Sequence, residues 1–450
     1  MFYTKRSGVM PAVQISDHLA MPPGASQPRR YYGWLVVAAS FVVVLLSTGI
    51  QGSFGNFLKP MSAEFGWDRS TASLPAALAI FMNGLFQPFV GRLIDRYGPR
   101  RVITLSLLLM AASTAAIAFT PGIWYLTGVY GVLFALAMSG AGITPNTTLV
   151  ARWFVRQRGR AMGIVNAGGS VGQLLIIPAS MALLLWTDWR TTYMALGGLL
   201  LLVGVPIAIL ILRSDPQELG LLPDGEPRAV SGTQEAAQHS QSSRQAPLES
   251  EHWRQAFTSS PLWLLMGGFF VCGFTLSTIT THFVAFTTDR GIAPAAAALA
   301  LGLVGGFNII GTLLAGTVSD RLGRKNPLAF IYLLRSIAFA VLLTAEAPWT
   351  LYLFAALVGL AWFSTVPLTV SLTAEMYGVR HMGTLVGLIF TSHQVGGALS
   401  IYLAGWLFDL SGSYTAIYLL DIVLLLVAGI ASYAIQERRY SLKYLTVVSG

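Results

Sequence analysis

The sequence predicts an all-α membrane protein in which twelve transmembrane helices form two pseudo-symmetric six-helix bundles. Hydrophobic residues make up 54% of the chain and charged residues only 10%, whereas ordinary soluble domains are about 25% charged. The apolar residues are gathered into runs of the roughly twenty residues that a bilayer core of about 30 Å requires. The second half of the 450-residue chain also repeats marker residues of the first, which indicates a duplicated unit.

Twelve apolar runs are long enough to cross a bilayer as helices. None keeps up the apolar–polar alternation that a transmembrane strand needs. The runs cover residues 33–56, 70–91, 101–120, 123–148, 160–183, 190–212, 261–286, 294–317, 327–345, 349–372, 383–407 and 414–435.

A short polar and basic stretch with two glycines occurs twice, at positions 225 residues apart. The copies read Gly91-Arg-Leu-Ile-Asp-Arg-Tyr-Gly-Pro-Arg-Arg101 and Gly316-Thr-Val-Ser-Asp-Arg-Leu-Gly-Arg-Lys325. An asparagine, Asn83 or Asn308, precedes the first glycine of each copy by eight residues. Because each stretch lies between apolar runs, it predicts a tight connection between two helices at the water interface.

The residue types in these two connections predict their geometry. Gly98 and Gly323 allow a turn with positive φ. The carboxylates of Asp95 and Asp320 stand where they can pair with an arginine or face a helix N-terminus.

The pattern G-x-x-x-D-R-x-G-x-[RK] resembles the signature loop that follows the second helix of each half in the major facilitator superfamily of transporters. The resemblance covers residues 30–436 and implies the fold of that family. It also implies that the loop is a conformational latch that does not bind substrate. The latch residues implied in this way are Gly91, Asp95, Arg96, Gly98, Arg101, Gly316, Asp320, Arg321, Gly323 and Lys325.

A second motif resembles one branch of that family. The stretch Arg152-Trp-Phe-Val-Arg-Gln-Arg-Gly-Arg-Ala-Met-Gly163, with the small residues up to Gly172, resembles the helix-5 signature of the monocarboxylate transporter branch. Tyr32-Gly33-Trp34 is similar to the other signature of that branch. The bacterial oxalate/formate exchangers are close cousins, and they remain the alternative branch.

The formal charge of +9 follows the topology of the chain. With the N-terminus inside, Arg335 lies within a run and 23 of the 28 basic residues lie in the cytoplasm. This positive-inside bias predicts that both termini are cytoplasmic and that the protein is multi-pass in the plasma (inner) membrane. The charge is therefore no sign of nucleic-acid binding. The basic residues expected outside are Lys59, Arg69, Arg190 and Arg290.

Composition divides the chain into two cytoplasmic tails, two bundles and a cytoplasmic linker. The first tail lacks the apolar core of a cleavable signal peptide. The linker has no apolar periodicity, and we expect it to be disordered or partly helical on the membrane surface around Glu251–Phe257. The predicted bounds are 1–30 for the first tail, 31–213 for the N-terminal bundle, 214–258 for the linker, 259–436 for the C-terminal bundle and 437–450 for the second tail.

No motif indicates an enzyme or a cofactor. The chain has no G-x-x-x-x-G-K-[ST] phosphate loop and no paired Cys/His spacing for a metal. Cys272 is the only cysteine, so no disulfide forms within the chain, and we expect this side chain to serve packing. Without a nucleotide site, transport has to run on an ion gradient or on exchange.

Ionisable side chains inside a membrane are costly, so they are candidates for the functional site. We expect His393 to carry a proton or to donate to a substrate carboxylate; its alternative role is a structural hydrogen bond. Arg335 offers a bidentate fork to an anion, or it bonds buried carbonyls or Glu375. His282 lies where the family resemblance implies the substrate path, or it faces water at the interface. Asp421 is a candidate proton-binding group.

Three amides complete the predicted substrate site: Asn83, Asn308 and Asn146. Each orients ligand oxygens or bonds a neighbouring helix. The sequence departs from the family pattern one turn after Asn308, where the resemblance implies an anion-binding arginine and this chain has Thr312.

The sequence thus predicts a secondary active transporter of small organic anions, monocarboxylates such as lactate or pyruvate, by proton symport and alternating access. We expect a monomer in the lipid bilayer, with a proton co-transported. Anion exchange of the oxalate/formate type, efflux of a hydrophobic or aromatic compound, and a sensor that binds without transporting are the alternatives.

Overall fold

The computed structural model describes residues 31–67, 69–225, 246–248 and 251–437. All regular elements in these ranges are helices. Twelve of the helical segments there are long and apolar enough to cross a membrane, which confirms the predicted fold class. The first predicted tail and residues 438–450 of the second lie outside the described residues, as do residues 226–245 and 249–250 of the predicted linker.

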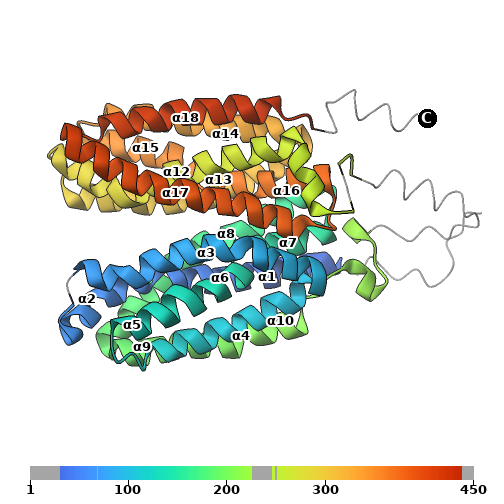
Figure 1. Cartoon of the computed structure of the whole chain (residues 1–450), viewed down its shortest axis with the longest axis horizontal. Coiled ribbons are helices and arrows are strands. Elements are labelled where there is room, and N and C mark those ends of the chain that lie inside the picture. Colours follow the sequence, from blue (N-terminus) through green and yellow to red (C-terminus); the bar gives the residue numbers. More distant parts are fainter. Residues whose placement is uncertain (1–30, 68, 226–245, 249–250, 438–450) are drawn as a thin grey trace, which may run out of the picture.

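The first six spans form one bundle, blue to green in Figure 1. Three of them contain more than one helical element, and the first of these is divided at Ser53 between α1 and α2. The fourth span changes from α to π geometry and back before it breaks at Gly142, and the sixth contains a second π segment. The elements are α1 (Tyr32–Gly52), α2 (Phe54–Phe65), α3 (Arg69–Tyr97), α4 (Pro99–Ile117), α5 (Ile123–Leu126), η1 (Thr127–Phe134), α6 (Ala135–Ala141), α7 (Ile143–Trp153), α8 (Arg158–Trp186), α9 (Trp189–Leu199), η2 (Leu200–Gly204) and α10 (Val205–Leu210).

The last six spans form the second bundle, yellow to red in Figure 1. Its helices α12, α13 and α15 each carry a proline in the first turn, where the missing N–H removes no helical hydrogen bond. The elements are α12 (Ser260–Asp289), α13 (Pro294–Leu322), α14 (Lys325–Leu343), α15 (Pro348–Ala361), α16 (Thr365–Tyr377), α17 (Met382–Ser411) and α18 (Thr415–Ala434).

One end of the molecule carries the α3–α4 and α13–α14 connections and the linker between the bundles (Figure 1). We call it the loop end, and the opposite end the far end. The linker has short 3₁₀ helices at Pro216–Leu219, Pro223–Gly225 and Trp253–Thr258, the last of which overlaps the segment expected to be helical.

Each end of the linker is bonded to one bundle at the loop end. A carboxylate oxygen of Asp224 accepts hydrogen bonds from the N–H groups of Val155 at 3.0 Å and Arg156 at 2.8 Å. On the other side, the N–H of Leu248 donates to the Met376 carbonyl at 2.8 Å.

Within each bundle, glycines let the first and fifth spans pack backbone to backbone. A Cβ on Gly172 of α8 would meet the backbone of Leu45 in α1, and one on Gly396 of α17 would meet the backbone of Phe270 in α12. Close approach at small residues is the main source of packing between membrane helices, because lipid gives no hydrophobic drive between them. The repeated glycines therefore produce the same close contact between the first and fifth spans in both bundles.

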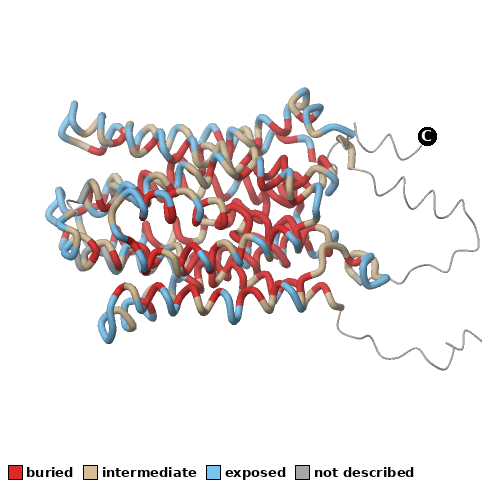
Figure 2. Tube along the Cα trace, turned by 60° about the horizontal axis from the view of Figure 1, so that its bottom comes forward, coloured by how far each residue is buried: buried red, intermediate tan, exposed pale blue. Residues whose placement is uncertain are grey.

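The two bundles meet through α3 against α17 and α8 against α13, again at glycines. A Cβ on Gly91 would meet the backbone of Gly383, and one on Gly316 would meet the backbone of Gly159. Figure 2 shows the buried residues gathered between the bundles and toward the loop end.

Contact between the bundles is lost toward the far end. In α8 most residues from 158 to 172 are buried, whereas Gln173 and the two leucines after it are exposed. In α13, a Cβ on Gly302, Gly305 or Gly306 would meet nothing within 4 Å. The described part of the chain is therefore closed at the loop end and open at the far end.

The close contact of Gly172 with α1 predicts opposite effects of two Gly→Ala changes on thermal stability. Gly172→Ala places a methyl against the backbone of Leu45, and such overpacking costs about 1–3 kcal/mol. Gly405→Ala meets nothing within 4 Å, so the better helix propensity of alanine stabilises by up to about 1 kcal/mol. Thermal unfolding in detergent should give a lower Tm for the first variant and an equal or higher Tm for the second. Equal Tm values for the two would contradict the close α1–α8 contact.

Candidate functional site

The α3–α4 connection joins the bundles through the carboxylate of Asp95. Gly98 has φ of +85°, which confirms the predicted turn geometry. One oxygen of Asp95 accepts the N–H of Gly383 at 2.8 Å, and the other accepts the N–H of Thr384 at 2.8 Å and its hydroxyl at 2.6 Å. These N–H groups lie in the first turn of α17. They have no acceptor within their own helix, and the helix dipole favours a negative charge beside them.

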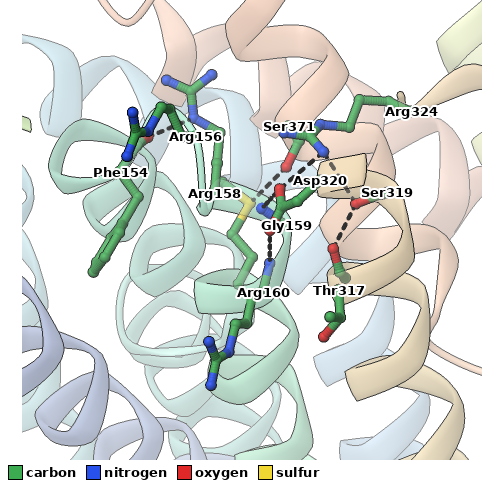
Figure 3. Close-up of polar contacts among 12 residues, drawn as sticks. Phe154, Arg156, Arg158, Gly159, Arg160, Thr317, Ser319, Asp320, Arg324 and Ser371 are labelled. Carbon is green, nitrogen blue, oxygen red and sulfur yellow. Dashed lines mark hydrogen bonds and ion pairs between the residues drawn. The ribbon is translucent and has the colours of Figure 1, made fainter. Parts of the chain in front are cut away.

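The α13–α14 connection makes the equivalent contact with α8 (Figure 3). Gly323 has φ of +84°, and the two oxygens of Asp320 accept the N–H groups of Gly159 and Arg160, each at 2.8 Å. Of the two partners that the sequence allowed for these carboxylates, Asp95 has a helix N-terminus and Asp320 has both a helix N-terminus and an arginine, Arg324. We call these two contacts the carboxylate latches.

Among the described residues, the second latch carries a charged network for which the first has no counterpart. Arg324 lies 2.8 Å from Asp320 and 3.0 Å from Glu375. The carboxylate of Glu437 accepts the N–H groups of Arg324 at 2.8 Å and Lys325 at 3.2 Å, at the start of α14. Sequence reasoning missed Glu437, because no spacing relates it to the repeated stretch, and it placed Glu375 only beside Arg335.

The other basic residues predicted for the latch lie around it on the surface. Arg96 is exposed and lies over the ring of Tyr97, 5.2 Å from its centroid. Arg101 and Arg321 are also exposed. The ammonium of Lys325 donates to the Tyr433 carbonyl at 3.2 Å.

His393 lies near the middle of α17, at the level where contact between the bundles ends. It is eleven residues from the start of that helix, roughly 16 Å at 1.5 Å per residue. Its Nδ1 is 3.1 Å from the Gln394 amide oxygen, and its ring packs against Phe269. The thiol of Cys272 lies beside the imidazole. His393 is partly exposed, so its imidazole has polar neighbours and can also be reached by solvent.

Arg335 of α14 is fully buried inside the second bundle. One guanidinium nitrogen donates to the thiol of Cys272 at 3.3 Å and to the hydroxyl of Thr275 at 3.4 Å. The other donates to the carbonyls of Ala361 and of Trp362, the latter at 2.8 Å. Of its predicted alternatives, the structure has the bonds to buried carbonyls, whereas Glu375 pairs with Arg324. Cys272 therefore stands between Arg335 and His393.

Asn308 links the bundles at the same level as His393. Its amide nitrogen donates to the hydroxyl of Ser170 in α8 at 2.5 Å, and its amide oxygen accepts the N–H of Phe363 at 3.0 Å. That oxygen also accepts the hydroxyl of Thr312 at 3.1 Å. Thr312 is fully buried, where its carbonyl faces Gly163 of α8, so the position implied for an arginine is part of the inter-bundle packing.

The other two predicted amides bond within the first bundle. Asn83 donates to the hydroxyl of Ser139 at 3.1 Å. Asn146 donates to the carbonyls of Ala141 and Gly142 at 3.0 and 2.8 Å, while its own amide oxygen is buried and unpartnered among the described residues. The structure thus brings Asn308 to the inter-bundle surface and gives Asn83 an intra-bundle partner, although the repeat relates the two.

His282 and Asp421 also belong to the second bundle, where His282 is partly exposed. The ring of His282 is 3.3 Å from both the Tyr414 hydroxyl and the Ile401 carbonyl. Asp421 is fully buried, and neither of its oxygens has a hydrogen-bond partner in the described chain. A carboxyl group in that situation is stable only when it is neutral, which fits its predicted proton-binding role.

One cavity lies away from these residues. It has a volume of about 410 Å³ on the first bundle at the far end, beside Phe119 and Arg190. Arg190 is not free to bind a ligand there, since its guanidinium makes two bonds of 2.8 and 2.6 Å to the carboxylate of Glu64. The same bonds, together with that of Trp189, lower the pKa of the exposed Glu64 carboxyl.

Comparison with known proteins identifies the family. The model of the Major Facilitator Superfamily matches residues 39–401. The chain belongs to the major facilitator superfamily. It is a transporter and not an enzyme, as the sequence predicted.

Relatives and solved structures agree with this assignment. The chain is similar to the uncharacterized MFS-type transporter YcxA of Bacillus subtilis, with 29% identity over 87% of this chain and 92% of the relative. It is 25% identical to monocarboxylate transporter 12 of Rattus norvegicus over 88% of this chain and 84% of that protein. The structure of the proton:xylose symporter XylE has 18% identity and a TM-score of 0.71 over 90% of this chain and 96% of that one, which shows the shared fold.

The latch geometry predicts the effect of removing one negative charge. Asp95→Asn keeps the shape of the side chain but turns an amide NH₂ toward backbone donors. Hydrogen bonds to a charged group contribute about 1.5–3 kcal/mol each, and 1.4 kcal/mol is about tenfold in an equilibrium. We expect the open population of the loop end to rise by at least about tenfold.

Spin labels on cysteines introduced at Gln157 and Val379 would measure this population, because both residues are exposed at the loop end and belong to different bundles. Asp409→Asn, an exposed carboxylate near the far end of α17, is the matched control. Unchanged distances in Asp95→Asn would contradict the role of the carboxylate latches.

Proposed function

We propose that this transporter carries small organic anions, monocarboxylates such as lactate or pyruvate, together with a proton, by alternating access. The observation that carries the proposal is the buried charge of Arg335. A guanidinium inside a membrane bundle is costly unless a negative charge compensates it. Its acceptors are two backbone carbonyls, the hydroxyl of Thr275 and the thiol of Cys272, and no ion pair with a carboxylate is found in the described residues. A bound anion would supply the missing charge.

The proposed anion position is beside His393, at the point where the bundles separate. At an effective dielectric constant of about 20, two unit charges about 8 Å apart attract by about 2 kcal/mol. An anion next to His393 would therefore be stabilised by Arg335 without touching it. The amide of Gln394, the neighbour of His393 in the chain, is partly exposed and offers donors and acceptors to the rest of a small ligand, whereas the buried Asn308 stays a prediction as a substrate contact.

His393 is the proposed proton carrier, with Asp421 as the second candidate. A histidine side chain can hold and release a proton, and this one is partly exposed. A protonated His393 attracts a carboxylate, and the carboxylate favours the protonated form, so the proton and the anion bind together. His282, Asn83 and Asn146 stay predictions as substrate contacts, because each forms its hydrogen bonds, within the described residues, inside one bundle.

We assign the loop end to the cytoplasm on the strength of the positive-inside bias. The far end is then open to the outside, and the carboxylate latches hold this outward-open state. FucP, a fucose:proton symporter solved in the outward conformation, is similar to this chain with 17% identity and a TM-score of 0.66 over 92% of this chain and all of that one. In the proposed cycle, ligand and proton binding lets the bundles rock, and Asp95 and Asp320 release their helix N-termini.

Uptake into proteoliposomes tests the proposal. Lactate, pyruvate, formate and oxalate would be supplied outside, with and without an inward proton gradient. We expect lactate or pyruvate to accumulate when the outside is acidic. His393→Gln should lower this proton-driven rate at least about tenfold, because the glutamine amide cannot carry the proton.

The matched control is His381→Gln, a histidine at the start of the same helix that bonds the Glu251 carbonyl at 2.8 Å. It should transport at the parent rate. Oxalate uptake that needs formate inside and ignores the gradient would select exchange instead. Absence of flux for all four anions, with Thr312 in place of the arginine, would favour efflux of an apolar compound.

A further inference from the structure

We infer that Arg335 is a positioning residue that holds the interrupted tenth span in shape and thereby sets the contact between the two bundles. Within the proposed function, this means that Arg335 acts on the anion through its field and through helix geometry, without binding it directly. The inference rests on the bonds that surround the break between α15 and α16.

The tenth span is broken at residues 362–364. Helix α15 ends at Ala361 and α16 begins at Thr365, so helical bonding is interrupted between them. Unpaired backbone groups inside a membrane cost several kcal/mol each. Arg335 donates to the carbonyls of Ala361 and Trp362 on the α15 side of the break, and without it these groups would be left with poorer partners.

The N–H group at the same break is used for contact with the other bundle. Phe363 donates its N–H to the amide oxygen of Asn308 at 3.0 Å. The amide nitrogen of that asparagine donates to Ser170 across the interface at 2.5 Å. The break is therefore bonded on one side by Arg335 and on the other by the bridge between the bundles.

Arg335 also ties the break to α12 and to the neighbourhood of His393. Its second nitrogen bonds Cys272 and Thr275, and the Cys272 thiol lies beside the imidazole. One planar guanidinium thus fixes the distance between the tenth span and α12. A lysine has a single donor centre and cannot span the same four acceptors.

The fourth span, the repeat partner of the tenth, is also broken but is held differently. Gly142 separates α6 from α7, and Asn146 of α7 itself donates to the carbonyls of Ala141 and Gly142. This break is closed mainly from within its own span, with one further bond of 3.3 Å from Ser47. Of these two breaks, only the one in the tenth span is bonded, among the described residues, to a charged side chain of another helix and linked through Asn308 to the opposite bundle.

Hydrogen exchange of the ligand-free protein tests the inference without any substrate. Arg335→Gln should raise amide exchange in a peptide covering 361–366 at least about tenfold and leave 141–147 unchanged. Asn146→Ala should do the reverse. Thr275→Val, which removes one acceptor of the guanidinium, should raise exchange at 361–366 to a smaller extent and serves if Arg335→Gln does not fold. Thr287→Val is its control, because that buried hydroxyl of α12 bonds only within its own helix.

Lactate uptake separates a positioning role from direct binding. Arg335→Lys keeps the charge but cannot hold the four acceptors, so we expect Vmax for lactate to fall at least about tenfold while KM changes less than about threefold. Arg335→Gln also removes the charge, so it should lower Vmax and raise KM as well. A KM raised about tenfold or more in Arg335→Lys, with unchanged exchange at 361–366, would overturn the inference and make Arg335 an anion ligand.

Parent-like exchange at 361–366 in both Arg335→Gln and Thr275→Val would also overturn the inference. If the parent protein moves no lactate, the proposed function fails, but the exchange results still decide the role of Arg335.

Discussion

The structure depends on two carboxylates that take the place of missing helix acceptors in the opposite bundle. Asp95 and Asp320 each accept two backbone N–H groups from the first turn of a helix across the interface. Such N–H groups have no partner within their own helix, and the glycines at both contacts let the backbones come close enough for the bonds to form. The same bonds must break if the loop end is to open, so the closed state is stable but not permanent.

This closure places the candidate site at the boundary between contact and separation. His393 and Asn308 stand where the buried part of the interface ends and the exposed part of α8 begins. Residues between this level and the loop end serve packing and the carboxylate latches. Arg335 is buried inside the second bundle, near His393. The proposed ligand would therefore meet an imidazole, the Gln394 amide and the field of a buried cation, while the buried Asn308 joins the two bundles beside it.

The sequence predicted what depends on local spacing or on repetition. The twelve spans, the positive φ at Gly98 and Gly323 and a helix N-terminus as one possible partner of the aspartates all followed from residue type and period. It could not predict that Glu437 caps α14, because that contact depends on where the last span ends in space. The breaks at Gly142 and Trp362 were also hidden, since an apolar run looks the same whether its helix is continuous or interrupted.

The repeat was a good guide to backbone and a poor guide to side-chain roles. Asn83 and Asn308 occupy equivalent positions, yet only Asn308 bonds the opposite bundle. Arg335 looked like an anion ligand because it is a permanent charge well inside a run, but one of its terminal nitrogens donates to the carbonyls of a helix break that the sequence does not reveal. Pairing of side chains across an interface depends on which helices face each other, and each half of a duplicated chain is free to change it.

The most direct test of the account is the equilibrium accumulation of lactate in proteoliposomes at a fixed pH difference and zero membrane potential. If an anion and a proton cross together, the ratio of internal to external lactate should follow the imposed proton ratio over a series of gradients, with no anion needed inside. A lactate ratio that stays at unity while the proton gradient is varied would contradict coupled transport by this protein.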